Sequence, residues 1–203
     1  IEEPNKPAER LKKMYPVGLV HGTYIICENE DGMYIIDQHA AAERINYEKY
    51  FTEMKKVKHD TTALLVPIKI ELPTDEAIRL KHNIGVLLDM GFEIEEFGIN
   101  TFIVRVHPTW LPTYMAEEAI RKIINIVIEK GEFDYGKFIE HVAITLACKM
   151  SIKANDFITM EDIEILLENL RNTKNPFTCP HGRPTIISYS KYDLEKLFKR
   201  AVN

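Results

Sequence analysis

The chain has 203 residues with a formal net charge of −5, and 45% of its residues are hydrophobic. That length is enough for one large domain or for two small domains that share a core. The acidic balance argues against a surface that holds nucleic acid tightly on its own, since phosphate binding depends on clustered Lys and Arg.

Neither a membrane span nor a secretion leader is expected, because no apolar run approaches the ~20 residues that cross a bilayer. The three cysteines, Cys27, Cys148 and Cys179, are an odd and low count, which fits a reducing cytoplasm better than a disulfide framework. The sequence begins at Ile1 rather than at a methionine, so we expect a fragment of a longer protein.

The first quarter of the chain predicts three strands followed by a helix. Apolar and β-branched residues indicate strands at Val17–Val20, Thr23–Glu28 and Met33–Asp37, with a turn signal before the last of them. A helix is expected over His39–Met54, with Asp37 or Gln38 near its cap position.

The middle of the chain predicts a strand, a helix, a two-stranded hairpin and a second helix, in that order at 64–72, 74–90, 92–97, 101–106 and 114–130. Pro67 interrupts the first of these strands, which indicates an edge position because proline cannot donate to a neighbouring strand. Thr74 is expected to cap the following helix and Gly91 to end it.

The last third predicts a long helix at 135–154 and a second helix that starts after Thr159. The Thr159 side chain is expected to form a capping box with Asp162. A short strand at 185–189 and a helix capped by Ser190 close the chain.

This succession, βββα then βαββα then ααβα, predicts an α+β fold, and its short connections leave no room for a long parallel array. The middle segment has its own αββα set. We therefore expect a subdomain at 73–137 inserted into a subdomain formed by both chain ends, 1–72 and 138–203.

The first candidate site lies where the third strand ends and the helix begins. Residues four apart share one face of a helix, so His39 and Glu43 can point at the same spot, with Asp37 beside them. A carboxylate and an imidazole in this arrangement form a usable half-site for a divalent metal. Glu48 lies about 140° further round the helix, where a supporting or solvent-facing role is expected. The structural alternative is a helix cap, a first-turn histidine and a solvated charge.

The second candidate site lies in the loop before the last strand. Cys179 and His181 are two residues apart in an extended segment, so their side chains project to one side. Pro180 and Pro184 stiffen that loop, and Gly182 lets the backbone come close. A thiolate and an imidazole are good zinc ligands, but this pair supplies only two of four positions, so a rigid turn without metal stays open.

The third candidate is Cys148 on the long helix. It shares a helix face with Ile144, Thr145 and Ile152, and that face is expected to be buried. A small core residue is therefore the alternative to a metal ligand. Cys27, inside an apolar strand, is expected to be a core residue only.

Together the three segments offer two thiols, two imidazoles and two carboxylates, namely Asp37, His39, Glu43, Cys148, Cys179 and His181. That set exceeds one tetrahedral shell and suits two neighbouring ions. A purely structural zinc site has no need of spare carboxylates, whereas a phosphodiester-cleaving site uses them to hold a metal that activates water.

Four motifs make the sequence resemble the MutL-type DNA mismatch-repair proteins. DQHAAAERINYE at 37–48 matches the pattern D-Q-H-A, two residues, E, four residues, E of the endonuclease-type members. ACK (147–149), CPHGRP (179–184) and LFKR (197–200) follow in the family's order. The first motif is highly specific and CPHGRP nearly as much, and together the four span most of the chain.

The resemblance implies the C-terminal domain of such a protein, a homodimeric, metal-dependent endonuclease that nicks one strand of duplex DNA near an existing discontinuity. It implies that the subdomain made of the chain ends dimerises and that the inserted one is regulatory. Asp37 and Glu43 carry over as catalytic carboxylates, and the metal ligands carry over as His39, Glu43, Cys148, Cys179 and His181. Zn²⁺ is then expected in a regulatory or structural role and Mn²⁺ or Mg²⁺ in cleavage. No nucleotide site is expected, because the family's ATPase domain is absent here.

The same resemblance implies duplex DNA, a DNA polymerase sliding clamp and, through the full-length protein, the mismatch-recognition protein MutS as partners, in the cytoplasm at the nucleoid. Candidate DNA-contacting residues are Lys149, Arg183, Lys199 and Arg200. The clamp-binding segment of bacterial members is a Gln, then mostly apolar residues, then Pro, and the corresponding residues here are Thr62, Leu64, Leu65, Val66 and Pro67. Threonine cannot replace the bidentate Gln amide, so an edge strand with a proline is the structural alternative.

Two other classes of function compete with the nickase. A catalytically silent, zinc-stabilised dimerisation and clamp-docking module would need the Cys and His residues but not Asp37. A metalloprotease or other hydrolase that uses His39 and Glu43 is disfavoured, because the H-E-x-x-H arrangement is absent.

Overall fold

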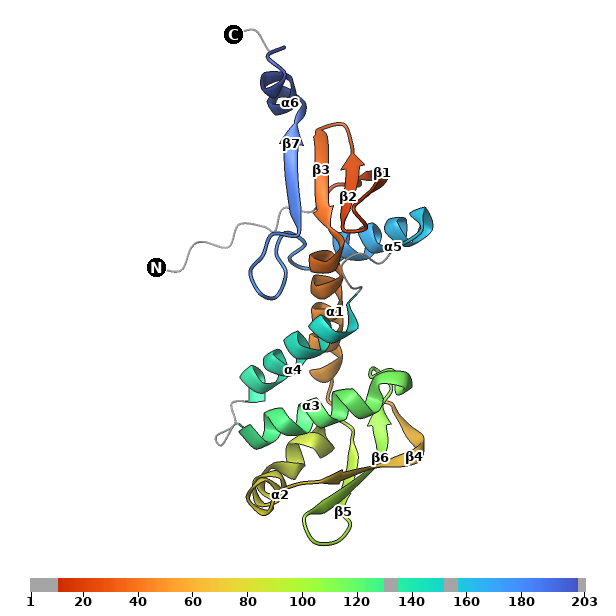
Figure 1. The fold of residues 1–203 in the computed structure, drawn as a ribbon, viewed down its shortest axis with the longest axis vertical. Coiled ribbons are helices and arrows are strands. Elements are labelled where there is room, and N and C mark those ends of the chain that lie inside the picture. Colours follow the sequence, from red (N-terminus) through yellow and green to blue (C-terminus); the bar gives the residue numbers. More distant parts are fainter. Residues whose placement is uncertain (1–10, 130–134, 152–156, 201–203) are drawn as a thin grey trace, which may run out of the picture. The chain divides into compact units, whose positions relative to one another are not determined.

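The computed structural model of the protein describes residues 11–129, 135–151 and 157–200. Its helices and antiparallel sheets confirm the predicted α+β class (Figure 1). The chain divides into two compact units, one formed by residues 1–48 and 147–203 and the other by residues 49–146. We call them the terminal unit and the central unit.

The terminal unit is built on a four-stranded antiparallel sheet in the order β1-β2-β3-β7 (Figure 1). Its strands are β1 (Tyr15–Val20), β2 (Tyr24–Glu28), β3 (Gly32–Asp37) and β7 (Ile186–Ser190). A Cβ atom on Gly32 would lie 2.1 Å from the carbonyl oxygen of Tyr189. Glycine at this position therefore allows the last strand of the chain to pair with the third.

The register across the sheet produces two apolar rows of side chains. The inner row holds one isoleucine from each of β2, β3 and β7, namely Ile25, Ile36 and Ile186. Because side chains alternate along a strand, the next row lies on the opposite face and consists of Ile26, Ile35 and Ile187. Ile187 is 51% exposed. The sheet therefore buries one apolar face and leaves a second one partly open.

Helix α5 (Met160–Arg171) supplies the other half of the core of this unit. Four of its apolar side chains share a buried cluster with the inner face of the sheet: Ile163, Leu166, Leu167 and Leu170. The predicted capping box is confirmed, since the Thr159 side chain accepts from the Asp162 N–H and the Asp162 carboxylate accepts from the Thr159 N–H. Cys27 is fully buried in the same cluster, and burial raises its pKa to about 12, so its assignment to the core is confirmed.

Helix α1 (Gln38–Met54) begins directly after β3. Asp37 caps it, because its Oδ1 accepts the N–H of Ala40 at 3.0 Å. Gln38 is fully buried, and its side-chain Nε2 donates to the carbonyl oxygen of Gly22 at 3.0 Å. The start of α1 is therefore tied to the turn between β1 and β2. Helix α6 (Lys191–Leu197) begins after Ser190, which forms a capping box with Asp193 as predicted for its cap.

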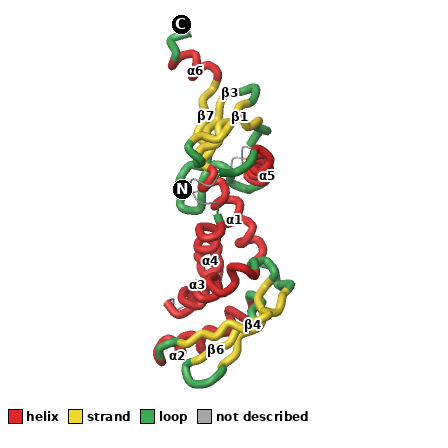
Figure 2. The backbone as a smooth tube through the Cα atoms, turned by 45° about the vertical axis from the view of Figure 1, so that its right-hand side comes forward, coloured by secondary structure: helices red, strands yellow, loops and turns green. Residues whose placement is uncertain are grey.

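The central unit contains a three-stranded antiparallel sheet in the order β4-β6-β5, with helices packed against it (Figure 2). Its elements are β4 (Thr61–Glu71), α2 (Thr74–Asp89), β5 (Glu93–Glu96), β6 (Thr101–Pro108), the 3-10 helix η1 (Thr113–Met115), α3 (Ala116–Glu129) and most of α4 (Tyr135–Met150). The last residues of α4, from Ala147 on, belong to the terminal unit. Pro67 lies on β4, an edge strand, in a stretch where the register shifts between Ala63 and Ile68. The predicted edge position is confirmed.

One detail of the predicted middle segment is wrong. Thr74 is the first residue of α2 and does not cap it, because its hydroxyl accepts from the Asn100 side chain at 2.7 Å. The unit boundaries also differ from the predicted 1–72, 73–137 and 138–203. Residues 49–72 fall in the central unit because β4 pairs with β6 along both of its ends, and residues 138–146 of α4 fall there too. Residues 152–154 of the helix predicted at 135–154 lie outside the described residues.

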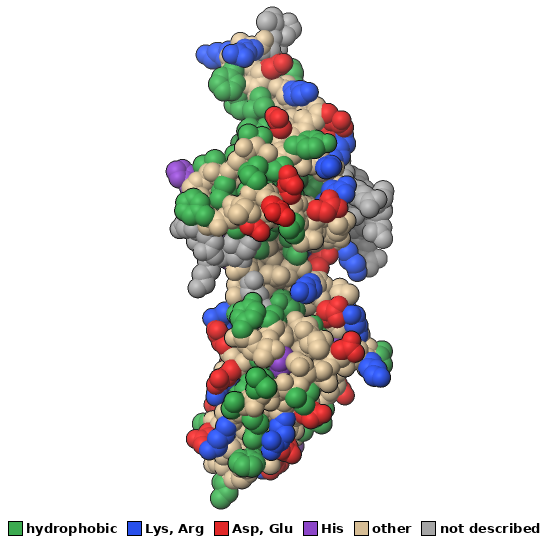
Figure 3. All heavy atoms as spheres, turned by 90° about the vertical axis from the view of Figure 1, so that its right-hand side faces the viewer, with side chains coloured by type: hydrophobic (Ala, Val, Ile, Leu, Met, Phe, Trp, Pro, Cys, Tyr) green, Lys and Arg blue, Asp and Glu red, His purple; other side chains and the backbone are tan. Residues whose placement is uncertain are grey.

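The surface carries both signs of charge. Acidic and basic side chains are interspersed on the face shown in Figure 3. Exposed ion pairs such as Arg79–Asp75 and Arg105–Glu95 account for part of this pattern. Among the described residues, no helix combines the length and the apolar character that a membrane span requires.

Candidate metal centre

Three segments of the terminal unit meet around the carboxylate of Glu43. Glu43 lies on the second turn of α1 and is only 2% exposed. The Cys148 thiol, near the end of α4, donates to Oε1 of Glu43 at 3.2 Å. His181, in the loop before β7, lies with its Nε2 3.3 Å from the Cys148 sulfur. Donor atoms of these three residues all lie within 4.8 Å of one another, close enough to share one metal ion.

The two other expected ligands lie at the edges of this group. Nε2 of His39 is 3.3 Å from Oε1 of Glu43, so the two side chains share a helix face as the i, i+4 spacing predicts. The Cys179 sulfur is 4.0 Å from Nδ1 of His181. All five residues that the sequence nominated are therefore linked by contacts through Glu43 and His181.

The loop that carries Cys179 and His181 is shaped by its own backbone. The N–H of Cys179 donates to the carbonyl of Arg183 at 2.8 Å, and the N–H of Gly182 donates back to the carbonyl of Cys179 at 3.0 Å. Gly182 has a φ of 83°, a left-handed conformation that favours glycine. The Thr185 hydroxyl also bonds to the carbonyl of Pro176. These bonds make the loop a tight turn that holds the thiol and the imidazole together.

Helix α1 anchors this loop from outside. Nε of Arg44 donates to the carbonyl of Thr178 at 2.5 Å. The Glu48 carboxylate accepts the backbone N–H groups of Lys174 and Asn175 at 2.7 and 3.1 Å. Glu48 therefore has a supporting role, one of the two expected for it. The contribution of Arg44 was missed, although its i, i+4 spacing from Glu48 could have indicated it.

Arg183 turns toward the candidate centre. Its Nη2 lies 2.9 Å from Oε2 of Glu43, and its side chain is 57% exposed. His181 approaches the same oxygen, with Nδ1 at 3.4 Å. The two oxygens of Glu43 thus have different surroundings: Cys148 and His39 at Oε1, and the Arg183 guanidinium and His181 at Oε2.

The charges around Glu43 determine its protonation. Burial alone would raise the pKa of Glu43, but the Cys148 hydrogen bond and the positive charges nearby outweigh burial and lower that pKa. Burial and the neighbouring Glu43 carboxylate raise the pKa of the Cys148 thiol to about 11. The carboxylate is therefore charged at neutral pH, while the thiol keeps its proton in the absence of a metal.

Asp37 has a different position from the other candidates. Its Oδ1 is used as the cap of α1, and Asp37 does not belong to the described group of clustered donor atoms. Of the other candidate DNA-contacting residues, Lys149 lies in the last turn of α4, next to Cys148. Lys199 and Arg200 follow α6, where the Arg200 guanidinium lies 6.0 Å from the centre of the Phe198 ring.

The segment that resembles a clamp-binding motif belongs to the central unit. Leu65 and Val66 are 101% and 77% exposed, in the stretch of β4 where the register shifts. Thr62 pairs with His107 of β6 through its backbone. Two large apolar side chains are thus presented to solvent on an edge strand.

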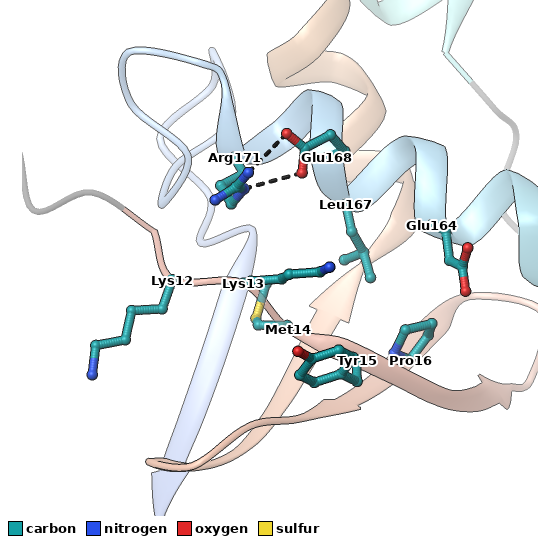
Figure 4. A pocket seen from close by; sticks show the side chains of 9 residues that line it. All are labelled: Lys12, Lys13, Met14, Tyr15, Pro16, Glu164, Leu167, Glu168 and Arg171. Carbon is teal, nitrogen blue, oxygen red and sulfur yellow. Dashed lines mark hydrogen bonds and ion pairs between the residues drawn. The ribbon is translucent and has the colours of Figure 1, made fainter.

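A separate hollow of about 300 Å³ lies between the segment before β1 and α5 (Figure 4). It is lined by Lys12, Lys13, Met14, Tyr15, Pro16, Glu164, Leu167, Glu168 and Arg171. Arg171 pairs with Glu168 at 2.9 Å, and Lys12 pairs with Asp31 at 2.7 Å. The hollow shares no residue with the candidate metal centre, and pairing within and beside it offsets much of its charge.

The donors of the candidate centre fit a zinc ion. Thiolate and imidazole are the ligands that zinc prefers, and carboxylate oxygen is also common. Cys148, Cys179, His181, His39 and Glu43 supply all three types within one group of contacts. The buried, charged carboxylate of Glu43 would compensate part of the charge of a divalent ion.

Comparison with known proteins defines the class of this chain. Residues 17–158 match the family described as MutL C terminal dimerisation domain. The chain therefore belongs to that family, and the resemblance seen in its motifs is confirmed.

The relatives that the chain matches are DNA mismatch repair proteins named MutL. That of Listeria welshimeri is 50% identical over 201 residues, which cover 99% of this chain and 33% of the relative. Those of Halalkalibacterium halodurans and Bacillus mycoides are each 45% identical, over 97% and 100% of this chain and 31% of each relative. The chain thus spans about a third of the length of the curated relatives it matches.

Proposed function

We propose that this domain is a metal-dependent endonuclease that nicks one strand of duplex DNA during mismatch repair. The observation that carries the proposal is the meeting of Glu43, Cys148 and His181, from three distant segments, within 4.8 Å. A buried carboxylate at the centre of thiols and imidazoles is costly unless positive charge compensates it. Arg183 supplies one such charge at Oε2, and a divalent ion bound on the Oε1 side would supply more, lower the pKa of water and neutralise phosphate.

The candidate ligands would form two sets, each suited to a different kind of metal ion. Cys148, Cys179 and His181 are soft or borderline donors and would hold Zn²⁺ in a regulatory or structural role. Asp37, His39 and Glu43 would serve a harder ion, Mn²⁺ or Mg²⁺, for which carboxylate oxygens are the preferred ligands. The cap bond of Asp37 uses Oδ1 and leaves Oδ2 for such a role. Arg183, being 57% exposed, can face a backbone phosphate on the solvent side.

The central test is the replacement of Asp37 by asparagine. Asn is nearly isosteric and still caps helices, so the fold and most bound zinc should survive. The negative charge that a hard ion needs is lost, so relaxation of supercoiled plasmid with added manganese should fall to background. The comparison is made at matched protein concentration and low salt, because the net charge of −5 makes DNA binding by this domain weak.

Two controls make the outcome decisive. Zinc content and thermal unfolding of the Asp37→Asn variant should match the wild type. If the variant nicks as well as the wild type, Asp37 is only a helix cap and the nickase assignment of this carboxylate is wrong. If neither nicks, the same pair is compared in the full-length protein.

A catalytically silent, zinc-stabilised dimerisation and clamp-docking module is the second candidate function. It is favoured by one observation, namely that the clustered donors are mostly thiol and imidazole while Asp37 bonds to the backbone of α1. Such a module would bind zinc as tightly as the nickase and would show no manganese-dependent nicking in any form of the protein.

The homodimer of the proposal would form through the open face of the terminal sheet. That face carries the row Ile26, Ile35 and Ile187, and the exposed side chains of Val17 and Tyr24 lie on β1 and β2. Apolar side chains exposed on a sheet are stabilised when a second copy covers them. The other proposed partners are duplex DNA, the sliding clamp at Leu65 and Val66, and MutS through the full-length protein, at the nucleoid.

A further inference from the structure

A concentration of positive charge lies in the central unit, in the connection between α1 and β4. Lys55, Lys56 and Lys58 fall within four consecutive positions there. They line a hollow of about 540 Å³, which we call the lysine hollow. Its other lining residues are Met54, Val57, His59, Leu88, Asp89, Gly91 and Tyr135. One acid, Asp89, stands against three lysines among these described residues, so the lining is positive in a chain whose net charge is negative.

The three lysines differ in the interactions that their side chains make within the protein. Lys56 pairs with Glu53 at 2.5 Å, where both side chains are partly exposed, and Lys55 lies 3.9 Å from the centre of the Phe51 ring. Lys58 makes no hydrogen bond or ion pair with the other described residues and is exposed. Exposed pairs of this kind are weak and exchange readily for another anion.

His59 lies at the wall of the lysine hollow. Both of its ring nitrogens are buried and have no hydrogen-bond partner among the described residues. A neutral imidazole carries one N–H donor and one acceptor, and burial without partners is unfavourable for both. The ring packs on Gly91, where an added Cβ would lie 2.9 Å from the Cβ of His59. The ring thus packs against Gly91 as part of the wall of the hollow, and its nitrogens face the protein interior.

We propose that the lysine hollow binds backbone phosphates of duplex DNA. Phosphate oxygens would accept from the lysine ammonium groups. Lysine binds phosphate as a point charge rather than through a planar fork, so the contact would be independent of base sequence. This inference rests on the proposed function only in taking DNA as the ligand, and it requires neither bound metal nor cleavage.

The test measures binding of a labelled duplex by fluorescence anisotropy in the presence of EDTA, so that nicking plays no part. The full chain is compared with the triple variant Lys55→Gln, Lys56→Gln and Lys58→Gln. Each lost phosphate contact reduces the slope of log affinity against log salt by about 0.9, so three contacts reduce it by about 2.7. Between 50 and 200 mM salt the wild-type affinity should therefore fall about 40-fold more than that of the variant.

The matched control is the triple variant Lys69→Gln, Lys81→Gln and Arg105→Gln. It changes the charge of the same unit by the same amount at exposed ion pairs outside the hollow. Equal losses in both triple variants would mean that only net charge matters, and the proposal would be overturned. It would also be overturned if the lysine variant lowered thermal stability and left DNA affinity unchanged, since the lysines would then serve only the end of α1.

Two further arms separate this inference from neighbouring ones. Inorganic phosphate at millimolar concentration should compete weakly with the duplex. If it shifts the His59 ring resonances in NMR spectra while the duplex does not bind at 50 mM salt, the ligand is free phosphate and the DNA assignment is wrong. The Asp37→Asn variant should bind the duplex as the wild type does, so a failure of the nickase proposal leaves this result intact.

Discussion

Replacing Arg183 by glutamine is expected to weaken metal binding at the candidate centre. The guanidinium lies 2.9 Å from Oε2 of Glu43, whereas Cys148 and His39 contact Oε1. A metal ion held through Oε1 can therefore coexist with the ion pair on Oε2. Arg183 would orient the carboxylate and compensate its charge, rather than compete with the metal for it.

The expected loss of metal affinity depends on how exposed the two partners of the Arg183–Glu43 ion pair are. Hydrogen-bond partners of metal ligands typically change metal affinity by about 10–100-fold. Glu43 is 2% exposed, but the Arg183 side chain is 57% exposed, so solvent screens the interaction. We therefore expect the lower end, a loss of about tenfold or about 1.4 kcal/mol. The Cys148 thiol gives a second reason to expect weaker zinc binding. Burial raises its pKa, and the charge of Arg183 opposes that rise, so loss of Arg183 would disfavour the thiolate form that binds zinc.

The assay is competition for zinc between the protein and a chromophoric chelator. Arg171→Gln is the matched control, because Arg171 is a partly exposed arginine of the same unit that pairs with Glu168 instead. Arg183→Lys should be intermediate, since it keeps the charge and loses the planar fork. With cobalt in place of zinc, the visible bands should report any change in thiolate ligation. Unchanged or tighter zinc binding by the Arg183→Gln variant, with an intact fold, would refute the reasoning.

The remaining predictions concern the ligands, the assembly and the clamp. Alanine at both Cys179 and His181 should remove most bound zinc, measured by elemental analysis, and full occupancy in that variant would contradict the ligand assignment. The domain should be a dimer by light scattering at tens of micromolar, and Ile187→Lys should make it monomeric; a monomeric wild type counts against the proposed sheet interface. A sliding clamp should bind weakly, and Leu65→Ala with Val66→Ala should abolish that binding. Unchanged clamp affinity would return this segment to the role of an edge strand.

Features set by short-range chemistry could be predicted from the sequence. Thr159 and Ser190 indicate helix N-termini because a hydroxyl at the cap position accepts the backbone N–H of the residue three positions later. Both residues form the expected caps. Pro67 indicates an edge strand because it lacks a backbone N–H donor, and β4 is an edge strand. The i, i+4 spacing of His39 and Glu43 fixes a shared helix face, and their side chains meet at 3.3 Å.

Features set by distant partners could not be predicted in the same way. The subdomain boundary is one example, because β4 follows α1 in sequence but pairs with β6, some 40 residues further on. Thr74 is another, since its hydroxyl is taken by Asn100 from a different hairpin. Arg183 was expected to face DNA, and its ion pair with Glu43 becomes visible only when the loop is folded against α1.

The spacing of the first motif acquires a physical reason from these contacts. His39 and Glu43 lie one turn apart and face the candidate centre, whereas Arg44 and Glu48 lie one turn apart on a neighbouring face. Arg44 binds the carbonyl of Thr178, and Glu48 binds the N–H groups at the start of the same loop.

One helix therefore supplies two candidate ligands and also fixes the loop that supplies two more, Cys179 and His181. The final Glu of the motif is explained by this anchoring and needs no metal. Since the candidate ligands on α1 lie more than 100 residues from those on α4 and in the loop before β7, the centre exists only in the folded terminal unit. Metal binding and folding of this unit should then stabilise each other. Loss of Glu48 would therefore loosen the loop and weaken zinc binding, although Glu48 bonds to the loop backbone and not to the candidate ligands.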